Sequence, residues 1–384
     1  MSDGSASPAR SPFLGELLFP DFQPFAFQAQ RLLSECHWGG GDATEAVRAI
    51  ARIRPGDFES WYAEWHALAE HAREGAVHQM GAGHTATAIE RFLSAANYYR
   101  SAEFFLPHTD PRAMPTWRAI SDAFARASEL MGARFKSFSI PYVDGGTLPG
   151  YIVRPVIDRE PRGTVIFLNG ADGMMEESWV CAGRAFVERG LNFITIDGPG
   201  QGGPLREQGI VSRPDYEVAV SPVLDYARGL DFVDSDRIAL CGMSMGGYYA
   251  GRVASNEPRL ACVAIHGALF NMMSDSWPRY PGKRPRMRWI TGSADDDELQ
   301  VRLAEFDLTN EAPKITMPIY ISHGEEDTLV DPKAARALYE AVGSVDKTLR
   351  MWSSDGLGGA THCSVDNPVE PLQETADWLA DHLA

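Results

Sequence analysis

The stretch Gly242-Met243-Ser244-Met245-Gly246 decides the fold, because of the segments on either side of it. Residues 237–241 form a short apolar run, as in a buried parallel strand. Residues 247–254 are small and apolar and predict the start of a helix. A G-x-S-x-G sequence between a strand and a helix is typical of a nucleophile elbow, a strained turn that presents a serine hydroxyl. The sequence therefore predicts Ser244 as a nucleophile.

A serine nucleophile needs a histidine that accepts its proton and a carboxylate that orients the histidine. After an elbow of this kind, the acid precedes the histidine along the chain. The predicted strand at residues 317–322 leads into an acidic loop, in which we choose Asp327 as the acid. The predicted strand at residues 347–352 is followed by a glycine-rich loop that carries His362, the natural base. We therefore predict a catalytic triad of Ser244, Asp327 and His362.

Other ionisable residues near these positions are alternatives for the acid or candidates for supporting and pocket roles. Glu325, Glu326 and Asp331 are alternatives for the acid, although charges of an exposed loop or helix start explain them too. His323 ends a predicted strand and is expected to brace the acidic loop rather than transfer protons. His266 ends another predicted strand and is a candidate for lining a substrate pocket.

Acyl transfer also needs hydrogen-bond donors for the oxyanion. One donor is expected from the amide of Met245, the residue after the nucleophile. The second is expected from the amide of Ala171, in a glycine-rich loop that follows the predicted strand at residues 164–168. The glycines of residues 197–202 do not open a helix directly after a strand, so they are no dinucleotide-binding fingerprint. Since a P-loop is missing as well, no cofactor is predicted.

Composition narrows the class of protein and its partners. The chain has 384 residues with a hydrophobic fraction of 44%, enough for an enzyme core and something extra. A net charge of −17 argues against nucleic acid or an anionic membrane as partner. The basic cluster at residues 283–288 is followed by acidic residues 295–298, so we expect a solvated or salt-bridged face there.

Cysteine and histidine usage points to a reducing compartment without a metal site. Five cysteines lack paired spacing, and Cys363 beside His362 is expected to be buried. The spacings of His66, His71 and His78 differ from the i, i+4 pair of a helical metal site, so no metal is predicted. Neither a signal peptide nor a membrane span is recognised, and we expect a cytoplasmic protein.

The hydrophobic pattern divides the chain near residue 134. Residues 1–14 are expected to form a disordered tail, and residues 15–134 have the apolar spacing of an N-terminal helical domain. Residues 135–384 alternate between strand and helix patterns. This alternation predicts an α/β catalytic domain with a mostly parallel sheet and helices on both faces. Residues 270–313, rich in Trp, Pro and charge, are expected to form a cap insertion.

With these motifs the chain resembles an α/β-hydrolase of the subgroup with a helical N-terminal domain. That subgroup includes FrsA-like esterases, a bacterial dihydroxypseudooxynicotine hydrolase and fungal polyketide-shortening hydrolases. The resemblance covers roughly residues 55–384 and rests on residues 97–106, 197–202, 242–247 and 362–363. It implies the α/β-hydrolase fold, the triad and oxyanion amides named above, and Tyr99 and Arg100 as pocket residues. The family often has Gly-Gly where this chain has Asn169-Gly170.

The resemblance also implies a reaction, since members of this subgroup split C–C bonds beside a ketone as well as esters. Both reactions pass through a tetrahedral oxyanion, but C–C cleavage must expel a carbanion and protonate it. His362 is expected to supply that proton, and Asp275 in the predicted cap is a candidate for an extra acid. We therefore expect a serine-type hydrolase that cleaves a C–C bond in a small aromatic or polyketide-like β-dicarbonyl substrate.

Other functions stay open at this point. A carboxylesterase or thioesterase acting on a small acyl ester is the main alternative, because the same residues perform that reaction. A peptidase is less expected, since the region before the sheet is too short for a propeller. A non-catalytic binding protein would be expected to lack a triad residue, and none is missing. The expected partner is a small molecule, and a homodimer is an expectation from the family alone.

Overall fold

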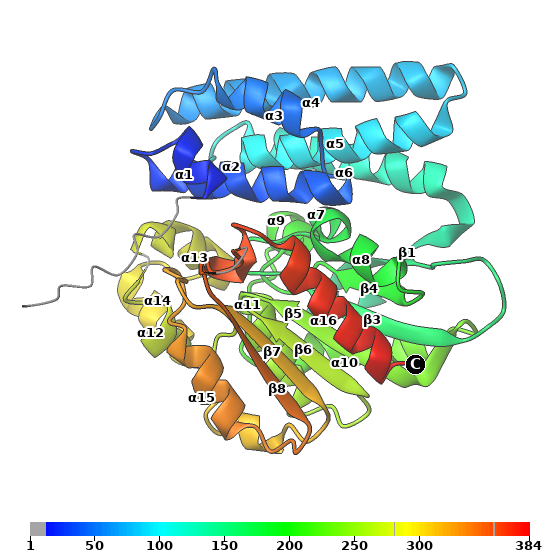
Figure 1. Cartoon of the computed structure of the whole chain (residues 1–384), viewed down its shortest axis with the longest axis vertical. Coiled ribbons are helices and arrows are strands. Elements are labelled where there is room, and N and C mark those ends of the chain that lie inside the picture. The colour runs from blue at the N-terminus through cyan, green and yellow to red at the C-terminus, as the bar shows by residue number, and fades with distance from the viewer. Residues whose placement is uncertain (1–12, 280, 356–357) are drawn as a thin grey trace, which may run out of the picture.

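The computed structural model describes residues 13–279, 281–355 and 358–384. It consists of a layer of helices above one end of an eight-stranded sheet (Figure 1). Residues 1–12, most of the predicted tail, lie outside the described residues. In the described ranges, no helix combines the length and the apolar character needed to cross a membrane.

The helical layer comes first in the chain. Its elements are α1 (Leu14–Leu18), α2 (Gln23–Glu35), α3 (Ala43–Ile50), α4 (Phe58–Gly81), α5 (Thr85–Glu103) and α6 (Ala113–Met131), with a short 3-10 helix η1 (Cys36–Trp38) after α2. Asp42 and Asp57 begin α3 and α4, since each carboxylate accepts a hydrogen bond from the third amide of the helix. The last helix of the layer ends at Met131, and the first strand follows at Phe135.

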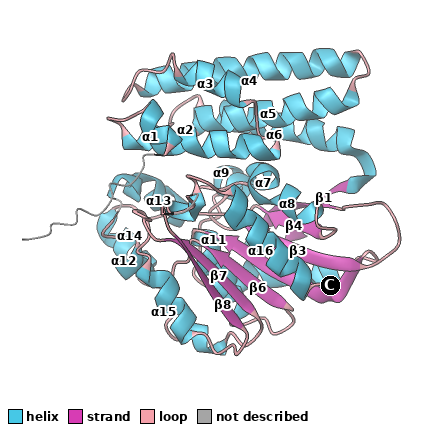
Figure 2. Cartoon of the chain, in the orientation of Figure 1, coloured by secondary structure: helices cyan, strands magenta, loops and turns pink. Residues whose placement is uncertain are grey.

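The sheet is mostly parallel, as predicted (Figure 2). Its strands are β1 (Phe135–Pro141), β2 (Thr147–Val153), β3 (Arg162–Leu168), β4 (Asn192–Ile196), β5 (Val233–Met243), β6 (Cys262–His266), β7 (Ile319–Gly324) and β8 (Lys347–Trp352). They are arranged in the order β1-β2-β4-β3-β5-β6-β7-β8. The pairs β1–β2 and β2–β4 are antiparallel, and all pairs from β4 to β8 are parallel.

Helices cover both faces of the sheet, which confirms the predicted fold class. They are α7 (Met175–Ser178), α8 (Arg184–Val187), α9 (Gly202–Gln208), α10 (Glu217–Arg228), α11 (Met245–Ala254), α15 (Lys333–Ala341) and α16 (Val369–His382). Neighbouring strand residues point to opposite faces. In β4, Phe193 packs in the core that includes α8 and α16, whereas Ile194 packs in the core that includes α10, α11 and α15.

The helical layer shares a core with the sheet. Trp61 and Trp65 of α4 belong to the same apolar cluster as Phe167 and Phe193 of the sheet. Because this core is continuous, the layer is held in place above the carboxyl ends of the strands. Between β6 and β7, the predicted cap insertion contains α12 (Met272–Asp275), η5 (Pro281–Lys283), α13 (Arg284–Thr291) and α14 (Asp296–Leu303).

Candidate active site

Ser244 lies on the sharp turn between β5 and α11. Its backbone has φ 58° and ψ −122°, a strained conformation for a residue with a side chain. A Cβ on Gly242 would collide with the carbonyl of Gly246, and a Cβ on Gly246 with the carbonyl of Leu168. The Ser244 amide donates to the His266 carbonyl at 2.8 Å, which ties the turn to β6. The chain therefore forms the predicted elbow, with glycines where neighbouring backbones approach most closely.

The structure brings the three predicted triad residues together. His362 Nε2 lies 2.8 Å from Ser244 Oγ, and His362 Nδ1 lies 2.6 Å from Asp327 Oδ2. The other carboxylate oxygen of Asp327 accepts hydrogen bonds from the amides of Leu329 and Val330, at 2.8 and 2.9 Å. These contacts fix the carboxylate, and the carboxylate fixes the orientation of the imidazole.

Burial and charge act in opposite directions on the ionisation of this group. Burial lowers the pKa of His362, but the Asp327 carboxylate and, after it, the neighbouring Cys363 together outweigh burial and raise that pKa above its ordinary value. Burial raises the pKa of Asp327, whereas His362 and His323 bring it well below the usual range. The carboxylate is therefore ionised and is placed to stabilise a positive charge on His362.

The other candidates in the acidic loop are engaged elsewhere. Glu325 pairs with Arg336 at 3.3 Å, and Asp331 pairs with Arg279 at 2.5 Å. Glu326 accepts a hydrogen bond from Ser354. By contrast, Nε2 of the fully buried His323 lies 3.1 Å from Asp327 Oδ2, on the side of the carboxylate that faces His362. This position suits the bracing role expected for His323.

Ala171 and Met245, whose backbone amides are the expected oxyanion donors, line one cavity together with Ser244 and His362. In the described parts of the chain, neither amide donates a hydrogen bond to another protein group. The loop before Ala171 is held by Gln201, whose side-chain amide donates to the carbonyls of Asn169 and Gly170 at 2.9 and 2.7 Å. The two amides are therefore available to a ligand oxygen beside the nucleophile.

Asn169 fixes the same loop. Its side-chain oxygen accepts the Gly170 amide at 2.8 Å. Its side-chain nitrogen donates to Glu177 at 3.1 Å and to Ser178 at 3.2 Å. Gln201, which also holds this loop, belongs to the glycine-rich segment 197–202. That segment therefore supports the oxyanion loop.

Two cavities meet at Ser244. The first lies beside α2, with a mixed lining that includes Arg31, Glu35, Trp38, Asp172, Lys283 and Cys363. The second lies beside the cap, with a mainly apolar lining that includes Leu269, Met272, Trp277, Met287, Leu299 and Leu303. A carbonyl placed at Ser244 thus has space for one substituent in a cavity of mixed lining and for another in a mainly apolar one.

Several of these lining residues were missed in the sequence. The helical pattern of α2 indicates core packing and says nothing of Arg31. The basic cluster at residues 283–288 was expected to be a solvated or salt-bridged face. Arg284 and Arg288 do pair with Asp296, at 3.4 and 2.8 Å, but Lys283 lines both cavities and corrects that expectation. Nothing in the local sequence distinguishes Lys283 from its neighbours.

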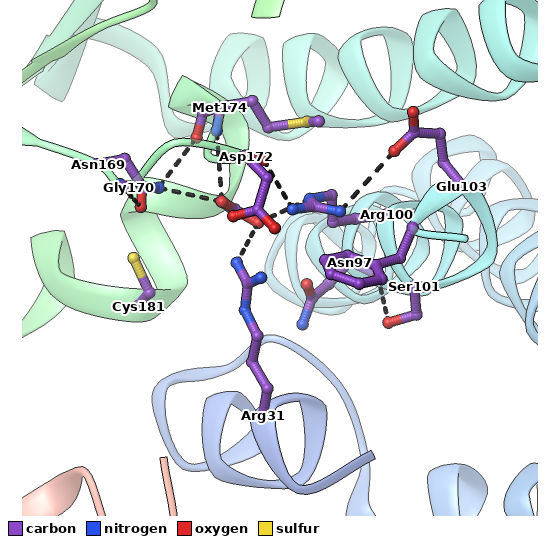
Figure 3. A network of polar contacts seen from close by, with 12 residues as sticks. Arg31, Asn97, Arg100, Ser101, Glu103, Asn169, Gly170, Asp172, Met174 and Cys181 are labelled. Carbon is purple, nitrogen blue, oxygen red and sulfur yellow. Dashed lines mark hydrogen bonds and ion pairs between the residues drawn. The ribbon is translucent and has the colours of Figure 1, made fainter. Parts of the chain in front are cut away.

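Tyr99 and Arg100 are placed differently from the expectation, since neither lines a cavity at Ser244. Tyr99 is buried, with its hydroxyl on Glu70 of α4. Arg100 is also buried and donates through Nε to Glu177 and through Nη2 to the carbonyl of Asp172, both at 2.8 Å (Figure 3). The side chain of Arg100 therefore holds the loop after β3 instead of reaching the nucleophile.

His266 and Asp275 also fall outside both cavities. His266 Nδ1 lies 2.9 Å from the Ser322 hydroxyl, and burial lowers the pKa of its imidazole to about 4. Asp275 accepts hydrogen bonds from the amides of Phe270 and Asn271, at 2.9 and 2.7 Å, which closes the turn before α12. The structure thus gives both residues supporting positions, contrary to the expected pocket and acid roles.

Cysteines and metal ligands add little to the site. All five cysteines are free thiols, and Cys363 is buried, as expected, at the wall of the first cavity. Among the residues that the structure describes, no cluster of three or more His, Cys, Asp or Glu side chains has the arrangement to hold a metal ion.

The mostly parallel sheet, the elbow after β5 and the contact of serine, histidine and aspartate define the α/β-hydrolase fold. The family described as "Esterase FrsA-like" matches residues 45–308. The chain belongs to this FrsA-like esterase family, which confirms the resemblance found in the sequence. A second family, "Serine aminopeptidase, S33", matches only residues 299–354, a segment without Ser244.

Fungal hydrolases are among the curated relatives of this chain. The α/β-hydrolase xenA of Xenoacremonium sinensis is 35% identical over 68% of this chain and 63% of its own length. The 20-hydroxy-prefusarin hydrolase FUS2 of Gibberella moniliformis is 35% identical over 64% of this chain and 61% of its own length. The chain therefore spans less than two thirds of these two relatives.

Among solved structures, the 2,6-dihydroxy-pseudo-oxynicotine hydrolase matches with a TM-score of 0.81 and 27% identity. The match covers 91% of this chain and 95% of that protein. AbyA5 matches with a TM-score of 0.65 over 89% of this chain and 94% of its own, but at 18% identity it supports the fold alone. Both structures extend through the helical layer, so the similarity includes the layer that covers the active site.

Proposed function

We propose that this protein is a serine-type hydrolase in which Ser244, His362 and Asp327 form the catalytic triad. The single observation that carries the proposal is the unbroken contact from Ser244 Oγ through His362 to Asp327, at 2.8 and 2.6 Å. A half-buried serine on a strained elbow, beside two amides without protein acceptors, has the parts that acyl transfer requires.

The reaction follows from this geometry. His362 Nε2 accepts the proton of Ser244 while Oγ attacks a substrate carbonyl carbon. The carbonyl oxygen becomes an oxyanion that receives hydrogen bonds from the amides of Ala171 and Met245. The intermediate then collapses, His362 returns the proton to the leaving group, and water hydrolyses the acyl-serine with His362 again as base. Asp327 stabilises the imidazolium in both half-reactions.

We further propose that the enzyme cleaves a C–C bond beside a ketone in a small aromatic or polyketide-like β-dicarbonyl molecule. The resemblance to the subgroup supports this reaction, as does the match to a protein named 2,6-dihydroxy-pseudo-oxynicotine hydrolase across 91% of the chain. The two cavities at Ser244 suit a ketone with a substituent on each side.

Hydrolysis of a small carboxylic ester or thioester is the second candidate. The match to the "Esterase FrsA-like" family over residues 45–308 favours it, and the same triad and amides perform it. The two reactions differ in the leaving group, because an alkoxide or thiolate leaves without further help, whereas a carbanion must be delocalised.

The test is Ser244→Ala, assayed with an aryl ester and an aryl β-diketone and followed by product masses. We expect the variant to keep its fold by circular dichroism and to lose about 10⁴-fold or more in kcat on every substrate that the wild type cleaves. A Ser255→Ala variant, which removes a serine from the end of α11, is the matched control. An active Ser244→Ala variant would contradict the triad, and the products formed by the wild type decide between the two reactions.

A further inference from the structure

Lys283 occupies a singular position at the junction of the two cavities. Among the described residues, Ser244, His362 and Lys283 are those that line both the first and the second cavity. Lys283 ends η5 in the cap, whereas the other two residues belong to the triad. A substrate that extends into both cavities therefore passes Lys283 at the point where it passes the nucleophile.

The charge of Lys283 acts on the loop that carries the oxyanion amides. Burial raises the pKa of Asp172, but Lys283, then Arg100 and Arg31, outweigh burial and bring that pKa well below its ordinary value. Asp172 follows Ala171 directly and lines the first cavity. Figure 3 shows Asp172 with Arg31 and Arg100 beside it, on the loop after Gly170. Lys283 therefore brings its positive charge to the edge of the oxyanion loop.

Other cations near Ser244 are less suited to contact a substrate at this junction. Arg31 lines the first cavity but not the second. Arg284 lines the second cavity alone, where its guanidinium lies over the ring of Trp277. Of these three cations, Lys283 is the one that lines both cavities, so it lies beside a leaving group in either cavity.

C–C cleavage places a negative charge on the leaving group, and this charge needs stabilisation near the junction of the two cavities. When the tetrahedral intermediate collapses, the bond between the attacked carbon and the adjacent carbon breaks, and its electron pair moves toward the second carbonyl. The leaving group is then an enolate with negative charge on oxygen, and a cation beside that oxygen lowers the barrier to its formation. An ester leaving group carries no second carbonyl and makes no such demand.

We propose that Lys283 is a substrate-binding residue that holds the second carbonyl oxygen of a β-dicarbonyl substrate and stabilises the enolate as it leaves. The inference rests on the C–C hydrolysis proposed above. In balance, R–CO–CH₂–CO–R′ and water give R–COOH and CH₃–CO–R′. Ser244 keeps the acyl group until water releases it, His362 delivers the former serine proton to the carbanion carbon, and the Lys283 ammonium keeps its own protons.

The experiment compares Lys283→Met and Lys283→Arg with the wild type on 1-phenylbutane-1,3-dione and on phenyl acetate. We expect Lys283→Met to lower kcat/KM for the diketone about 10- to 100-fold and to change kcat/KM for the ester less than about threefold. Lys283→Arg keeps the charge and should recover most of the diketone activity. Lys314→Met is the matched control, because Lys314 is an exposed lysine that pairs with Glu311 at 2.9 Å.

The outcomes separate this inference from the function on which it rests. Equal losses on both substrates, or no loss on either, would overturn the role of Lys283 and leave the hydrolase assignment standing. A wild-type protein that cleaves phenyl acetate but not the diketone would overturn the C–C reaction itself, and the Lys283 role with it. If Lys283→Met does not fold by circular dichroism, Lys283→Gln with the same two substrates makes the same comparison.

Discussion

The elbow around Ser244 and the helical wall above it are built in opposite ways. The elbow is held by sterics within a few residues, where Gly242 and Gly246 admit the backbones that cross there. The wall is held by contacts between distant segments, which include buried charges beside the shared apolar core: Glu177 binds Arg31 of α2 at 2.6 Å and Arg100 of α5 at 2.8 Å. The side chains of Glu177 and Arg100 are 1% and 4% exposed, so this ion pair lies in the protein interior.

This difference explains where chemistry and selectivity reside. A local turn needs few residues, and its residues can be recognised as a motif. A buried ion pair offsets the large desolvation cost only when its geometry and its further hydrogen bonds are satisfied. Arg100 binds the Asp172 carbonyl as well as Glu177, and it thereby connects the helical layer to the oxyanion loop. Three experiments break or sharpen the contrast.

The largest effect is expected for Gly246→Ala, because the added methyl collides with backbone atoms of β3 that cannot move independently. We expect a loss of about 100-fold or more in kcat and destabilisation by about 2 kcal/mol or more. Activity assays and chemical denaturation measure both. Gly81→Ala at the end of α4, where no atom lies within 4 Å of the added Cβ, should change stability by less than about 1 kcal/mol. A fully active Gly246→Ala enzyme would refute the steric account.

An intermediate effect is expected for Arg100→Lys, which keeps the charge but loses the fork that binds Glu177 and the Asp172 carbonyl together. As a positioning residue, Arg100 should affect kcat, by about 10-fold, and KM much less, because the oxyanion loop shifts. The neighbouring Tyr99→Phe is the control, since it removes a hydroxyl that binds Glu70 within the helical layer. If Arg100→Lys and Tyr99→Phe change kcat and KM by the same factors, Arg100 has no connection to the oxyanion loop.

The smallest expected effect is a shift in the pH at which kcat/KM is half of its maximum. His362 must be neutral to accept the Ser244 proton, and Asp327 raises the pKa of His362 above 6.5. Activity should therefore be lost as the pH falls, with a midpoint of kcat/KM above the ordinary histidine value. Asp327→Asn removes the raising charge and should move the midpoint of the remaining activity downward. A wild-type midpoint below 6.5 would contradict this electrostatic account.

Much of the fold and of the triad geometry was accessible from the sequence because their signals are local. Strand–helix alternation predicts the parallel sheet, and the order of Ser244, Asp327 and His362 places each residue after a strand. Parallel strands bring their carboxyl ends to one edge of the sheet, so such residues meet. The positions of Tyr99, Arg100, His266 and Asp275 were misjudged, because a family motif or a strand end does not tell which way a side chain points.

The sequence by itself determined the α/β-hydrolase fold, the FrsA-like resemblance and the residues that meet at Ser244, because periodicity, glycine sterics and chain order encode them at short range. Only the tertiary structure decided what surrounds the nucleophile. The first cavity joins Arg31 of α2 to Asp172 of the oxyanion loop, and Lys283 of the cap reaches both cavities. These residues are far apart in the chain, and packing of the helical layer and cap onto a shared core is the physical reason that they come together.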